Sequence, residues 1–130
     1  MVYHRKLTKI KNFLKGGSVQ FKSVDAILCY GFPVGDEDNI PNWAKMWINN
    51  GKGLEEKYGL ALIAHGGVYD PMYLLVVKES IQEACQGKPI SLGQAIDAKP
   101  EWGEKLKRFC QEQGVEYQAP QLILCSNWTE

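Results

Sequence analysis

Residues 59–80 read GLALIAHGGVYDPMYLLVVKES, two apolar runs on either side of a polar turn. Each run is short, rich in branched side chains and bounded by glycine, proline or aspartate, a pattern typical of two strands joined by a hairpin. The chain has 130 residues, of which 45% are hydrophobic. That length and composition are enough for one domain with its own core, so we expect residues 1–130 to form a single domain around this hairpin.

Further elements are predicted on both sides of the hairpin. The run VDAILCYGF within residues 23–32 is short, apolar and closed by glycine and proline, which indicates a buried strand. The run QLILCSNW predicts a last strand, opened by Pro120. Helices are predicted after Pro41 and after Pro100, with a further turn over residues 54–58. Their apolar faces contain Trp43, Met46, Trp47 and Asn50 in the first helix, and Trp102, Leu106, Phe109, Cys110 and Gln113 in the second.

The order strand, helix, strand, strand, helix, strand resembles the split βαβ pattern of ferredoxin-like domains. This resemblance implies an α+β fold with a ferredoxin-like βαββαβ sheet. Short inserted helices are expected at the capping-box patterns Ser80-x-x-Glu83 and Ser91-x-x-Gln94. Residues 1–17 combine lysines and an arginine with leucine and isoleucine at helical spacing, which predicts a basic amphipathic helix that packs on the domain or extends from it.

An alternative reading makes residues 70–85 one helix. Strands and helices would then alternate and build an α/β three-layer, flavodoxin-like parallel sheet. In that setting the run AHGGV resembles the DsrE-like sulfur-transfer proteins. Their nucleophilic cysteine is expected near Ala119, which is not a cysteine, so the resemblance implies no such activity here.

Both faces of the predicted sheet are apolar. Ile27 and Cys29 would point to one side of the first strand, and Leu28 and Tyr30 to the other. A sheet with helices on one side only leaves its second face wet, so something must cover it: the N-terminal helix, a second subunit or a ligand. Because the layout resembles dimeric α+β barrels, we expect a homodimer that packs sheet on sheet.

Composition excludes several classes of protein. Fifteen Lys and Arg balance 15 Asp and Glu, so the overall charge gives no reason to expect a nucleic-acid partner. No window approaches the roughly 18 apolar residues that a membrane span requires. The four cysteines are far apart and form no C-x-x-C pair, which indicates reduced thiols, no zinc site and a cytoplasmic location. No cofactor is expected.

The best candidate for a functional residue is His65, placed where a strand ends and a loop begins. Imidazole titrates near physiological pH, and Gly66 and Gly67 let a substrate approach the backbone closely. We expect His65 to act as an acid–base group, with Tyr30, Tyr69 and Asp70 as its hydrogen-bonding neighbours in a ligand pocket.

Trp43 and Trp47 lie one helical turn apart and are predicted to supply an apolar wall or rim of that pocket. The acidic run over residues 36–38 has no metal-ligand spacing, so no metal site is expected. The expected function is a small cytosolic domain that binds a small molecule of unknown identity, with weak acid–base catalysis as an addition. The alternative is a non-catalytic assembly protein that uses its apolar sheet face and basic N-terminal helix.

Overall fold

The structure is a computed structural model that describes residues 20–21, 24–66, 71–92 and 97–126. Its elements are β1 (Gln20–Phe21), β2 (Ala26–Asp36), α2 (Asn42–Asn50), α3 (Lys52–Tyr58), β3 (Leu60–Gly66), β4 (Pro71–Val77), a short 3-10 helix η1 (Lys78–Ser80), β5 (Gln82–Ala84), α4 (Pro100–Gln113) and β6 (Gln121–Ser126). The predicted mixture of helices with a largely antiparallel sheet is confirmed, which is the signature of an α+β fold.

Strand β2 is the centre of the sheet. Its second half pairs with β4, and its first half pairs with β5 on the same edge and with β6 on the other edge. Outside β4 lies β3, and β1 pairs in parallel with β3. All other neighbours are antiparallel. Strand β2 thus pairs with chain segments that are far apart in sequence. Because β2 lies inside the sheet and both of its faces are covered, its residues are apolar on both faces.

The central hairpin is confirmed. Leu60 pairs with Val77, and the register continues to Gly66 opposite Pro71. The flavodoxin-like alternative is therefore wrong, because residues 71–77 form a strand and not part of a helix. Every residue of β4 except Met72 is buried, so its unbroken apolar run reflects a strand covered on both faces.

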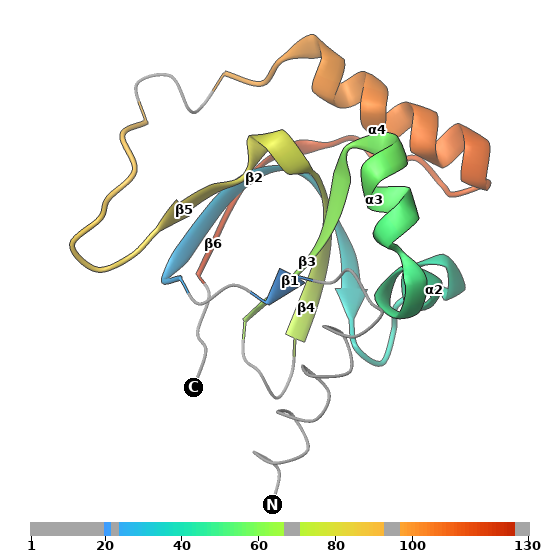
Figure 1. Ribbon diagram of the computed structural model, residues 1–130, viewed down its shortest axis with the longest axis horizontal. Helices are drawn as coiled ribbons and strands as arrows, with labels where there is room; N and C mark the ends of the chain where they lie inside the picture. Colours follow the sequence, from blue (N-terminus) through green and yellow to red (C-terminus); the bar gives the residue numbers. More distant parts are fainter. Residues whose placement is uncertain (1–19, 22–23, 67–70, 93–96, 127–130) are drawn as a thin grey trace, which may run out of the picture.

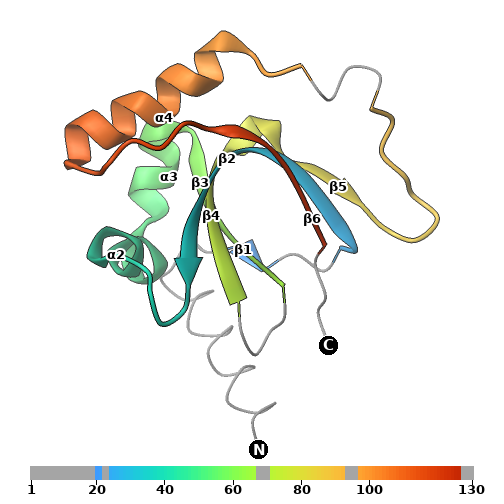
Figure 2. The ribbon, with the colours of Figure 1, turned by 180° about the vertical axis from the view of Figure 1, so that it is seen from behind.

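Helices α2, α3 and α4 lie on one face of the sheet (Figures 1 and 2). Helix α4 presents Trp102, Leu106, Phe109 and Cys110 to the core, which confirms most of its predicted apolar face. The exception is Gln113, which is exposed and donates a hydrogen bond to the hydroxyl of Tyr58. Gly114 ends the helix with a φ of 66°, a left-handed conformation that glycine adopts readily.

The apolar face of α2 differs from its prediction. Met46 is 70% exposed and Asn50 is exposed, while Ala44, Trp47 and Ile48 are buried. The helix is rotated because Trp47 packs edge-to-face on Phe109 of α4, at 5.4 Å between ring centroids. The position of α4 therefore decides which side of α2 is buried. The spacing of apolar residues along α2 does not reveal this tertiary contact.

The second face of the sheet is concave. The sheet curls so far that β6 approaches β3, although β4 and β2 lie between them (Figures 1 and 2). Buried residues from three strands form one apolar cluster on this face, which we call the concave cluster: Ile27, Cys29, Ala61, Ile63, Leu74 and Val76, with the partly buried Ile123 and Cys125 of β6 packed against it. The curvature of the sheet thus helps to cover this face, in addition to the N-terminal helix, second subunit or ligand that the sequence suggests.

The capping-box pattern at Ser80 does not begin an α-helix. The Ser80 hydroxyl donates to the carbonyl oxygen of Val77 and accepts the backbone N–H of Tyr30, and β5 follows directly. The serine therefore ties η1 to the central strand β2. The second pattern, at Ser91, extends into residues that lie outside the described part of the chain, as does the predicted helix over residues 1–17. Among the helices that the structure describes, none is long and apolar enough to cross a membrane.

The crossing of β2 and β4 gives a first prediction. A Cβ added at Gly31 would overlap the carbonyl oxygen of Leu75, which is backbone and has no room to move. We expect Gly31→Ala to lower the free energy of unfolding by about 3 kcal/mol in urea denaturation. The control is Gly53→Ala in α3, where an added Cβ meets nothing within 4 Å. This change should be neutral or stabilising by about 0.5 kcal/mol. Equal effects of the two substitutions would contradict the close approach of β2 and β4.

Candidate functional site

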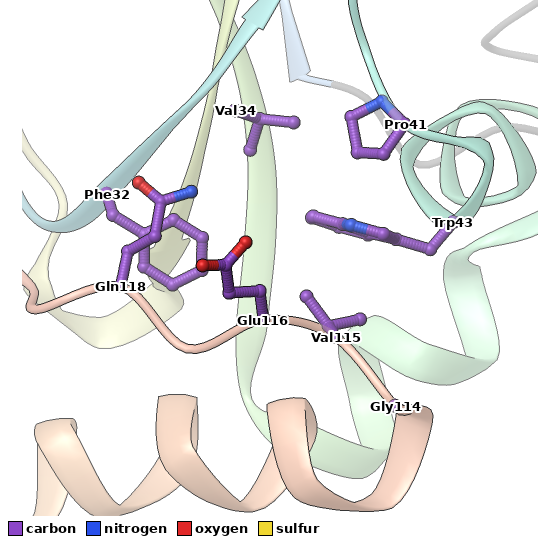
Figure 3. A pocket seen from close by; sticks show the side chains of 8 residues that line it. All are labelled: Phe32, Val34, Pro41, Trp43, Gly114, Val115, Glu116 and Gln118. Carbon is purple, nitrogen blue, oxygen red and sulfur yellow. The ribbon is translucent and has the colours of Figure 1, made fainter.

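A cavity of about 230 Å³ opens on the helix-covered side of the sheet (Figure 3). We call it the aromatic pocket. Its walls come from β2, the start of α2 and the segment that follows α4. The lining residues are Phe32, Val34, Pro41, Trp43, Gly114, Val115, Glu116 and Gln118. This volume lies below the roughly 300–1,000 Å³ of typical ligand pockets, so the space suits a small molecule.

Local structure explains why these segments meet. Phe32 and Val34 of β2 both pack on the helix-covered core, although the pairing of β2 with β4 shifts register between Pro33 and Gly35. The left-handed backbone of Gly114 ends α4, and the N–H of Val115 then bonds to the carbonyl oxygen of Cys110. The chain therefore turns back over the sheet before β6 begins, and residues 115–118 close one side of the cavity.

Trp43 forms the opposite wall. In Figure 3 its indole is seen edge-on, with Pro41 on one side and Val115 on the other. The ring is half-buried and packs edge-to-face on Phe109, at 5.5 Å between centroids. Trp43 thus lies at the rim of this cavity, which is not the predicted pocket around His65. Trp47 does not, because its side chain is fully buried in the core.

The polar side of the pocket consists of Glu116 and Gln118. Both side chains are exposed and lie beside Phe32 in Figure 3. Within the described residues, no ion pair or hydrogen bond holds either side chain. A carboxylate only accepts hydrogen bonds, whereas a primary amide both donates and accepts them. The site combines apolar walls with two polar groups that can orient a ligand.

Tyr30 lies on the same sheet face as the pocket but does not line it. Its ring packs on Trp102 at a centroid distance of 5.8 Å, and its backbone N–H bonds to Ser80. The residue therefore anchors the first turns of α4 to β2. The structure does not bring its ring to the pocket or to His65.

His65 lies on the opposite face. Along β3, Leu60, Leu62 and Ala64 belong to the helix-covered core, whereas Ala61 and Ile63 belong to the concave cluster. Alternation along the strand places His65 on the concave face, opposite Met72 of β4. The predicted arrangement in which His65 faces Tyr30 is therefore wrong. Tyr69 and Asp70, the other predicted neighbours of His65, lie outside the described residues.

Burial lowers the pKa of His65 from its ordinary value of 6.5. The imidazole is therefore mostly neutral at pH 7, the form that accepts a proton. The side chain is neither fully exposed nor fully buried, so His65 remains a candidate acid–base group at the end of the concave face.

The acidic run beyond β2 has a structural role at Asp36. One carboxylate oxygen of Asp36 accepts the backbone N–H groups of Asp38 and Asn39 and the side-chain amide of Asn39. These bonds close the turn that leads to α2 and position Pro41 and Trp43. Among the described residues, no group of three or more His, Cys, Asp or Glu side chains is arranged to hold a metal ion.

The cysteines are all free and provide no activated nucleophile on the helix-covered face or the concave face. Burial, together with the nearby Cys125 thiol, raises the pKa of Cys29 to about 12. Burial also raises the pKa of Cys110 and of Cys125. These three thiols therefore stay protonated at neutral pH, and the thiolate is the reactive form.

Sequence reasoning missed Phe32, Val34, Val115, Glu116 and Gln118. The one available signal is the segment of six residues, 115–120, between the helix-ending Gly114 and the strand β6. A polar connection that also carries an apolar residue often packs on a neighbouring element. Which element it packs on depends on the direction in which Gly114 turns the chain.

Comparison with known proteins assigns neither a family nor a function to this chain. No protein-family model, curated protein or solved structure matches this chain significantly. The candidate sites therefore rest on the geometry and chemistry of the chain itself.

Titration of His65 gives a second prediction. Because the folded-state pKa is below the unfolded value, the unfolded chain binds more protons between these two values. The stability that neutral His65 contributes is present above about pH 6.5 and is lost as the pH falls through the folded-state pKa. We expect an NMR midpoint below 6.5 for His65, and a smaller loss of unfolding free energy between pH 7 and pH 5 in His65→Gln. A midpoint at or above 6.5 would contradict the partial burial of the imidazole.

Proposed function

We propose that the protein is a small-molecule-binding domain whose ligand lies in the aromatic pocket. The observation that carries this proposal is a cavity with mostly apolar walls and two unengaged polar side chains at one side. Small-molecule sites are concave, mostly apolar and carry a few polar groups that fix the orientation of the ligand, and the aromatic pocket combines these features. The rings of Phe32 and Trp43 supply apolar contact, and Glu116 and Gln118 supply orientation.

The scaffold that we propose for this site is a ferredoxin-like sheet. Strands β2 and β3 are joined through α2 and α3, and β4 lies between them. Strands β4 and β6 are joined through α4, and β2 lies between them. Two interleaved strand–helix–strand units of this kind support the split βαβ topology, with β1 and β5 as additions. The fold hosts many activities, so it does not identify the ligand.

Acid–base catalysis at His65 is a separate proposal. The observation in its favour is the partly buried, neutral imidazole at the end of β3. His65 and the aromatic pocket lie on opposite faces of the sheet, so one small ligand does not touch both. Free cysteines support the proposal of a cytoplasmic, reducing environment for the protein.

A substitution in the pocket tests the binding function. Single-ring fragments are screened by ligand-observed NMR, and the dissociation constant of each hit is measured for Trp43→Ala. Because this change removes the pocket wall, we expect binding to weaken about tenfold or more. The control is Met46→Ala on the same helix, whose side chain is 70% exposed and does not line the cavity.

Melting curves of both variants separate loss of the wall from loss of the fold, since Trp43 also contacts Phe109. If the fragments bind Trp43→Ala and the wild type equally, the ligand does not lie in this pocket. Absence of any ring-containing hit would contradict the binding function as a whole.

A second candidate function is assembly as a homodimer. The observation that favours it is Leu124 of β6, a large apolar side chain that is 70% exposed. Exposed apolar surface next to an outer strand is typical of an interface between copies. Light scattering should then give a dimer mass, and Leu124→Asp should give a monomer mass with an unchanged melting curve. A monomeric wild type at micromolar concentration would contradict this role.

A further inference from the structure

We propose that the ligand of the aromatic pocket is a small aromatic cation, such as a primary amine on a short chain attached to one ring. This inference rests on the proposed binding function and specifies its chemistry. It follows from the acidic residue that lines the pocket and from the C-terminal helix end beside it.

The pocket has one ionisable lining residue, and that residue is acidic. Glu116 lines the cavity, and none of the lining residues is Lys, Arg or His. Among the described residues, no cation pairs with Glu116. A glutamate carboxylate can accept charge-assisted hydrogen bonds from an ammonium group. The amide oxygen of Gln118 is a second acceptor on the same side.

The end of α4 adds to the negative potential. Gly114 and Val115 line the cavity directly after this helix of 14 residues. A helix carries partial negative charge at its C-terminus, and the last turn of α4 contains no basic residue to neutralise it. The C-terminal end of α4 therefore favours a cation at this side of the pocket.

The N-terminus of α2 also borders the cavity, and a helix N-terminus by itself favours an anion. The pocket wall at this point consists of Pro41 and of the indole of Trp43. Pro41 and Val115 lie on the two sides of this indole, so its edge borders the cavity (Figure 3). The preference for a cation therefore rests on Glu116 and on the C-terminal end of α4.

The volume limits the size of this cation. A cavity of about 230 Å³ equals the space of roughly eight water molecules at about 30 Å³ each. One ring fits between the apolar walls of Phe32, Val34 and Trp43, which leaves the polar side for a short chain and its charge. In Figure 3 the carboxylate of Glu116 and the amide of Gln118 lie on the side of Phe32, across the cavity from the helix that carries Trp43.

Three probes of nearly equal shape test the charge preference: 2-phenylethylamine, 2-phenylethanol and phenylacetate, which are cationic, neutral and anionic at pH 7. Binding to the full chain is followed by the NMR shift of the Trp43 indole N–H, assigned with Trp43→Phe. We expect the amine to bind about fivefold tighter than the alcohol, and phenylacetate to bind most weakly.

Glu116→Gln keeps the shape of the side chain and removes its charge. In this variant the amine should lose most of its advantage, while the alcohol binds as in the wild type. The matched control is Glu104→Gln, an exposed glutamate on α4 that does not line the pocket and should leave the preference unchanged. Both positions are exposed, so both variants are expected to keep the wild-type melting curve.

The outcomes distinguish this inference from the function on which it rests. If the alcohol or phenylacetate binds as tightly as the amine, the cation preference is wrong while the pocket remains a binding site. If Glu104→Gln weakens the amine as much as Glu116→Gln does, the preference comes from overall charge and the inference is overturned. If none of the three rings binds, the inference and the binding function both fail.

Discussion

The packing of Phe109 is the interaction on which the rest of the structure depends. Its ring receives three aromatic neighbours edge-to-face, Trp43, Trp47 and Tyr58, at centroid distances of 5.5, 5.4 and 5.2 Å. These neighbours come from α2 and α3, so one side chain of α4 fixes all three helices on the same face of the sheet. Each such pair is worth about 0.5–1.5 kcal/mol beyond the burial of its area. The same contact holds Trp43 at the edge of the core, where its outer side forms the wall of the aromatic pocket.

Strand alternation divides the chemistry of the protein between two faces. The helix-covered face carries the aromatic pocket with its carboxylate and amide, while the concave face carries the concave cluster with His65 at the end of β3. The concave cluster excludes water and keeps the thiol of Cys29 protonated, with its pKa raised to about 12. The aromatic pocket therefore places a carboxylate and an amide beside apolar walls, whereas the concave cluster itself consists of apolar side chains.

Much of the fold was predictable because its signals are local. The hairpin of β3 and β4, the strand containing Cys29 and the helix after Pro100 each follow from runs or stripes a few residues long. The spacing of apolar residues does not predict the buried side of a helix that has two apolar sides. In α2 the buried side faces Phe109, which leaves Met46 exposed. The residues of the predicted site are not brought together: Trp43 lines the aromatic pocket, whereas Tyr30 and His65 point to different faces, since no local pattern fixes which strand ends meet.

The sequence by itself determined most of the elements: apolar runs made strands, and Gly114 ended α4 because its left-handed backbone disfavours other residues. It did not determine all of their ends, since β2 continues past Gly31 and Pro33 to Asp36. Only the tertiary structure decided which surfaces meet. The curl that brings β6 toward β3 covers the second sheet face, and the turn at Gly114 carries Glu116 to a wall built by β2 and α2. The physical reason is the distance along the chain over which each kind of interaction acts. Hydrogen-bonded elements and their caps are set by neighbours within a few residues, whereas a cavity depends on side chains from segments about 80 residues apart, whose meeting is fixed by packing of the whole core.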